Sequence, residues 1–83
     1  MNNEFEQAKE LLETAAEEEY ARAAGYELDA EHARAEIAYA RTHDDVNEDA
    51  VKLLKKTLED SERQAREHQL KAMNLKKAVR KLA

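Results

Sequence analysis

The sequence has no cysteine, no proline and only one glycine, and none of its apolar runs is long. Without cysteine, disulfides, thiolate metal sites and thiol nucleophiles are excluded. A membrane-spanning helix needs about 20 mainly apolar residues, and a signal peptide starts with a basic region that is missing here. We therefore expect a protein that is cytoplasmic, or a recombinant soluble protein, and that has no membrane partner.

Enzyme motifs are also missing. The chain has no glycine-rich phosphate loop, no nucleophile elbow and no His-Glu-x-x-His. Its Lys and Arg residues are spread among acids without interleaved aromatic residues, which argues against nucleic-acid binding. We expect neither an enzyme nor a nucleic-acid-binding protein.

Most of the chain is built from Ala, Glu, Leu, Lys and Arg, a composition typical of long helices. The only clear break lies near Asp44 and Asp45, and it is followed by Asn47, a favourable helix N-cap. The sequence thus predicts one all-α domain over residues 1–83. Its helices cover about 3–42 and 48–82, and a turn at about 43–47 makes them an antiparallel hairpin.

The second helix has an unbroken heptad pattern typical of a coiled coil. Its a and d positions are Val51, Leu54, Leu58, Ser61, Ala65, His68, Ala72, Leu75, Val79 and Leu82.

The first helix has two apolar stripes. One consists of Phe5, Ala8, Leu12, Ala16, Tyr20, Ala23, Ala30, Ala33, Ile37 and Ala40. The other consists of Ala15, Ala21, Ala24, Leu28, Ala35 and Tyr39. An apolar face this wide suits a helix with more than one neighbour.

The turn sets the register, because residue i of the first helix then lies near residue 90 − i of the second. The acidic N-terminal half of the first helix would lie beside the basic end of the second, and the opposite charges favour the antiparallel arrangement.

One hairpin would leave several large apolar residues exposed, namely Leu11, Leu28, Tyr39, Leu53, Leu70 and Met73. We therefore expect the chain to partner itself, as a homodimer that forms a four-helix bundle. The residues expected at helix interfaces are Phe5, Leu12, Tyr20, Ile37, Leu54, Leu58, Leu75, Val79 and Leu82. A rival layout breaks the first helix at Gly25 and gives a three-helix monomer.

His68 is the principal candidate for a functional residue, because it occupies a d position where the expected neighbours are small. A buried polar residue can fix the register and oligomeric state of a coiled coil, and this interpretation requires no cofactor. Two alternatives are haem ligated by His68 and a divalent metal held by His68, Glu19 and Glu27. Di-iron hairpins use Glu-x-x-His, and the nearest segment here is Asp29-Ala30-Glu31-His32.

In layout, the predicted hairpin resembles the helix-loop-helix proteins that dimerise into four-helix bundles, such as the Rop family and de novo designed hairpins. The resemblance implies self-association, and it carries over no RNA-binding residues. The narrow alphabet and regular heptads favour design, whereas the irregular Tyr, His and Gly positions of the first helix do not.

Overall fold

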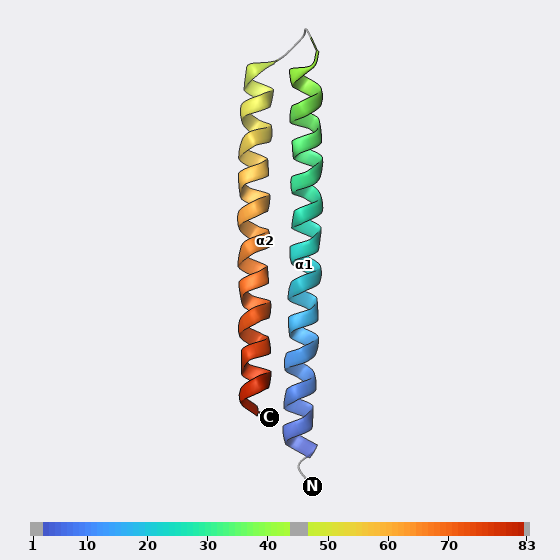
Figure 1. Ribbon diagram of the computed structural model, residues 1–83, viewed down its shortest axis with the longest axis vertical. Helices are drawn as coiled ribbons and strands as arrows, with labels where there is room; N and C mark the ends of the chain where they lie inside the picture. Colours follow the sequence, from blue (N-terminus) through green and yellow to red (C-terminus); the bar gives the residue numbers. More distant parts are fainter. Residues whose placement is uncertain (1–2, 44–46, 83) are drawn as a thin grey trace.

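The computed structural model describes residues 3–43 and 47–82, which form two long helices. Helix α1 spans Asn3–Arg41 and helix α2 spans Glu48–Leu82. The helices run antiparallel side by side (Figure 1), and the Cα atoms extend over 69 × 13 × 12 Å. The described residues contain no strand, so the expected all-α antiparallel hairpin is confirmed. The predicted turn at 43–47 falls largely on residues 44–46, outside the described residues.

Both inner helix ends are capped by polar atoms. The Asn47 side-chain oxygen accepts hydrogen bonds from the backbone N–H of Asp49 at 3.0 Å and of Ala50 at 3.2 Å. These are two of the N–H groups that a helix start leaves without a backbone partner, so Asn47 acts as the expected N-cap. At the end of α1, the Tyr39 carbonyl accepts from the Thr42 hydroxyl at 2.9 Å and from His43 Nδ1 at 2.8 Å.

Helix α1 continues without interruption through Gly25. A Cβ atom at this position would meet nothing within 4 Å, and the glycine does not adopt a positive φ. Glycine lowers helix propensity by roughly 1 kcal/mol relative to alanine, a cost that the rest of a 39-residue helix outweighs. The layout with a helix break at Gly25 is therefore not adopted.

The inner face of α2 follows the predicted heptads. All ten a and d residues are buried or half-buried, and the four that are buried are Val51, Ser61, Ala65 and Ala72. We refer to the contact between the two helices as the seam.

The inner face of α1 differs from the expected stripe. Ala8 and Tyr20 are exposed, while Lys9, Glu19 and Tyr26 are half-buried. The seam of α1 follows a strict three-four spacing through Phe5, Lys9, Leu12, Ala16, Glu19, Ala23, Tyr26, Ala30, Ala33, Ile37 and Ala40. The other eight residues of the expected stripe lie in the seam, so the apolar pattern was wrong by one position at Ala8 and at Tyr20, where the charged Lys9 and Glu19 take the seam positions.

Small side chains dominate the core. The buried apolar residues are one Val, one Ile and six alanines: Ala16, Ala23, Ala30, Ala33, Ala65 and Ala72. No large side chain is fully buried among the described residues. The hairpin therefore gains little of the burial that a core of Leu or Phe would provide, roughly 1.5–3 kcal/mol per fully buried side chain.

Candidate functional site

The middle of the seam holds a polar contact between the two helices. His68 from α2 donates a hydrogen bond through Nδ1 to Oε2 of Glu19, which occupies a d position of α1. The two side chains are 14% and 15% exposed, respectively, so both are largely withdrawn from water. A polar pair at such positions is tolerated when each group has a partner, and its geometry disfavours other registers.

The surroundings stabilise the charged form of Glu19. The pKa of its carboxyl lies below the ordinary value, chiefly because His68 donates a hydrogen bond to it. Partial burial acts in the opposite direction, and the positive charges of His68, Arg22 and Lys71 lower the pKa further. Arg22 Nη1 also contacts Glu19 Oε1 at 2.9 Å, so both carboxylate oxygens have donors.

Tyr26 completes this polar cluster from α1. Its ring stacks on the His68 ring with centroids 5.4 Å apart and planes 6° from parallel. Glu19 and Tyr26 lie about one turn to either side of residues 22 and 23, the level at which the expected register places His68. We call Glu19, Tyr26 and His68 the waist cluster.

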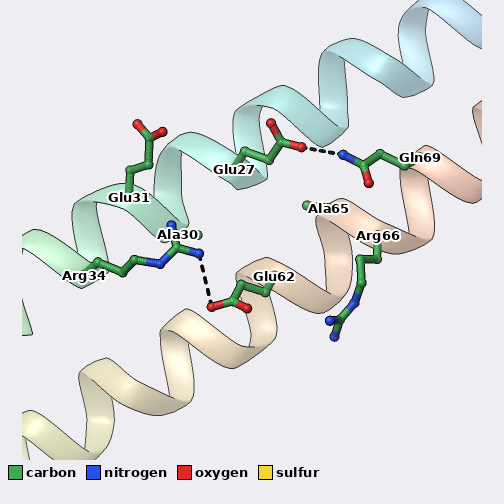
Figure 2. A pocket seen from close by; sticks show the side chains of 8 residues that line it. All are labelled: Glu27, Ala30, Glu31, Arg34, Glu62, Ala65, Arg66 and Gln69. Carbon is green, nitrogen blue, oxygen red and sulfur yellow. Dashed lines mark hydrogen bonds and ion pairs between the residues drawn. The ribbon is translucent and has the colours of Figure 1, made fainter.

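One edge of the hairpin is bridged by side chains that flank the seam (Figure 2). Glu27 accepts a hydrogen bond from Gln69, and Arg34 Nη2 contacts Glu62 Oε1 at 3.3 Å. Lys76 lies 5.0 Å from the centre of the Tyr20 ring in the same row. These pairs join residues that directly follow d positions in both helices, so polar contacts cover this side of the hairpin. We call it the bridged edge.

The bridged edge frames a shallow groove of about 420 Å³. Ala30 and Ala65 line it at the level of the seam, and Glu31 and Arg66 point outward from it (Figure 2). Charged side chains form most of its lining. Ligand pockets are usually concave and mainly apolar, so the groove has little of the character of a small-molecule site.

The candidate metal ligands do not converge as a set. Glu19 contacts His68, whereas Glu27 is bonded to Gln69 instead. Within residues 3–43 and 47–82, no three His, Cys, Asp or Glu side chains form a group that could hold a metal ion. Binding of a metal or haem by His68 stays a prediction, and a ligand on Nδ1 would displace the bond to Glu19.

The other two histidines lie outside the seam. His32 is exposed on α1, as are Asp29 and Glu31 of the segment nearest to a di-iron motif. The His43 ring stacks on the Tyr39 ring, with centroids 3.9 Å apart, at the end of α1.

The predicted interface residues divide between the seam and the surface. Tyr20 is exposed, Ile37 is buried, and the others are half-buried in the seam: Phe5, Leu12, Leu54, Leu58, Leu75, Val79 and Leu82. The six large apolar residues expected to remain exposed in a single hairpin are all exposed.

The acidic half of α1 and the basic end of α2 do lie along each other (Figure 1). In the described parts of the chain, however, the one ion pair between Lys or Arg and a carboxylate that joins the helices is Arg34–Glu62, nearer the turn. The opposite charges of the open end therefore act through solvent, where each exposed pair contributes at most a fraction of a kcal/mol, on the order of 0.5.

Comparisons of the chain with protein-family models, with curated proteins and with solved structures find no match. Neither described helix has a stretch apolar and long enough to cross a membrane.

Sequence reasoning identified His68 and expected Glu19 near it, but it assigned Tyr20 and not Glu19 to the stripe that faces α2, and it did not assign Tyr26 to that stripe. The signal was present: the alanines at 16, 23 and 30 and Ile37 are seven residues apart, and the d positions between them include 19 and 26. Gln69 and Glu62 were missed because flanking positions in a charged helix carry no distinguishing pattern.

Proposed function

We propose that this protein is a self-associating helical module whose function is to pair with a second copy and form a four-helix bundle. The observation that carries the proposal is the large exposed surface of the hairpin. The chain exposes 6528 Å², whereas a compact monomer of 9.5 kDa exposes about 5,000 Å².

The exposed area beyond that of a compact monomer is sufficient for an interface. A stable protein–protein contact buries about 800 Å² on each partner, and the excess is about twice that. The seam offers no alternative way to bury apolar area, because its buried residues are mainly alanine and it holds a polar pair in its middle. Hairpins of the Rop type, which this chain resembles in layout, also associate as pairs of hairpins.

Sedimentation equilibrium over a range of concentrations tests the proposal. We expect a mass of twice 9.5 kDa at micromolar concentration. The midpoint of thermal unfolding should rise with protein concentration, because association stabilises only the folded chain. A chain that remains monomeric at high micromolar concentration, with a midpoint independent of concentration, would contradict the proposal.

A further inference from the structure

The outer side of α1 carries a second regular stripe that faces away from α2. We call this the outer stripe; it consists of Ala21, Gly25, Leu28, His32, Ala35 and Tyr39, and all six residues are exposed. Their spacing of four, three, four, three and four residues is that of a coiled-coil face. In the heptad of α1 they occupy the positions opposite the seam, so they cannot contribute to the hairpin itself.

The outer stripe has clear ends. Continuing the same spacing toward the N-terminus reaches Glu18 and Thr14, which are polar, and the stripe therefore covers only the half of α1 nearer the turn. Residues 21–39 span on the order of 27 Å of helix. Leu28 is 51% exposed and Tyr39 is 66% exposed, so apolar area is available there for a partner.

We propose that the outer stripe is the surface on which a second copy of the chain docks, with the two α1 helices antiparallel. The inference rests on the proposed self-association and specifies its surface and orientation. It also specifies how the four helices are arranged: the two α1 helices lie in the middle and α2 of each copy lies on the outside, so the four helices pack as a single layer and do not surround a common core.

The choice of a second copy follows from how the stripe fits itself. About a two-fold axis near Ala30, Tyr39 of one copy meets Ala21 of the other, Ala35 meets Gly25, and Leu28 meets His32. The bulky Tyr39 then packs against the small Ala21 at each end, and Leu28 and His32, which are similar in size, pack together beside the axis. A parallel pairing would instead place Tyr39 against Tyr39 and Gly25 against Gly25.

Other surfaces of the hairpin offer less. The bridged edge is covered by charged and polar side chains, among them Glu27, Arg34 and Glu62. The large exposed apolar residues of α2 are Leu53, Leu70 and Met73; Leu70 and Met73 are neighbours, but Arg66 and Lys77 flank them and no longer row forms. Scattered apolar residues are ordinary on a protein surface, whereas a continuous row indicates an interface.

A matched pair of variants tests the surface. Leu28→Lys introduces a charge in the middle of the stripe, and Leu70→Lys introduces the same charge at an equally outward position of α2, where Leu70 is 57% exposed. We expect Leu28→Lys to raise the dissociation constant by more than about tenfold in sedimentation equilibrium, because a central apolar anchor is lost. Leu70→Lys should leave the dissociation constant unchanged.

The outcomes separate this inference from the proposed function. A dimeric wild type whose association is unaffected by Leu28→Lys overturns the docking surface and leaves self-association standing. A monomeric wild type overturns both. Circular dichroism of both variants checks that the hairpin still folds, as expected because both leucines are exposed.

Disulfide crosslinking tests the orientation, since the chain has no other cysteine. Leu28→Cys and His32→Cys chains of different mass are mixed and oxidised with a mild oxidant. The antiparallel arrangement predicts disulfides mainly between the two kinds of chain, because residues 28 and 32 face each other across the axis. Disulfides formed mainly between identical chains would overturn the antiparallel arrangement.

Discussion

His68 and Glu19 act as a unit in the seam, so neither side chain can be judged alone. We predict that His68→Leu lowers the free energy of unfolding, although leucine suits a d position better, because Glu19 then loses its partner at a largely buried site. The double variant Glu19→Leu/His68→Leu should be more stable than either single variant. Urea unfolding of the four proteins measures the coupling energy of the pair. A His68→Leu variant more stable than the wild type would contradict the prediction, and a coupling energy of zero would show that the pair contributes nothing.

The lowered pKa of Glu19 predicts a pH dependence. A carboxyl whose pKa is lower in the folded chain than in the unfolded chain stabilises the fold at pH above its unfolded value of about 4.5. This contribution is lost as the pH falls through the pKa of the folded chain. Thermal unfolding should therefore show a smaller decrease in stability below pH 4.5 for Glu19→Gln than for the wild type. Identical pH profiles would mean that Glu19 is not held in its charged form by His68.

Gly25 weakens α1 without a compensating contact inside the hairpin. Because a Cβ atom there would meet nothing within 4 Å, Gly25→Ala should raise the free energy of unfolding by roughly 0.5–1 kcal/mol. Chemical unfolding at a concentration where the chain is monomeric isolates this effect from docking. The reverse change at a neighbouring exposed position, Ala21→Gly, should lower stability by a similar amount, and equal stability of all three proteins would contradict the prediction.

At the scale of the elements, the two helices differ in how well the sequence defines their faces. The seam of α2 was predictable because its apolar residues follow one row, with Leu54, Leu58 and Leu75 as fixed points. Helix α1 has apolar residues on opposite sides, so its seam is less distinct in the sequence and is marked mainly by the seven-residue spacing of its buried alanines. Glu19 takes a d position between them and contacts His68. Glu27 was expected at the same site, but it lies just after a d position and reaches Gln69 at the edge.

Helix α2 begins with a side-chain cap, Asn47. Asn47→Ala removes the acceptor of two backbone N–H groups and should cost about 1 kcal/mol of unfolding free energy. Asn47→Asp is the matched control, because aspartate caps a helix start equally well and is favoured by the helix dipole. If alanine and aspartate at this position gave the same stability, the observed cap would be irrelevant to folding.

At the scale of the whole molecule, a long thin hairpin can bury more area only by using its outer faces, and these faces carry most of the charge. The bridged edge shows how flanking residues meet when two helices pack antiparallel: residues that directly follow d positions lie opposite each other, as Glu27 and Gln69 do. In the outer stripe, Leu28 and Ala35 occupy the positions that correspond to d. The residues that directly follow them, Asp29 and Glu36, therefore flank the stripe in the same way. In the antiparallel dimer, Asp29 of one copy therefore lies beside Glu36 of the other, and the contact occurs twice.

This like-charge contact predicts how salt affects the dimer. Exposed repulsion is screened when the Debye length falls from about 10 Å at 0.1 M to about 3 Å at 1 M ionic strength, so added sodium chloride should lower the dissociation constant. The double variant Asp29→Asn/Glu36→Gln should associate more tightly than the wild type at low salt and respond less to added salt. Sedimentation equilibrium of both proteins at low and high salt measures the two effects.

The control for net charge is a second double variant, Asp60→Asn/Glu67→Gln, which removes two acidic charges from α2 and leaves Asp29 and Glu36 in place. If both double variants responded to salt alike, the repulsion would reflect overall charge, and Asp29 and Glu36 would not face each other in the dimer.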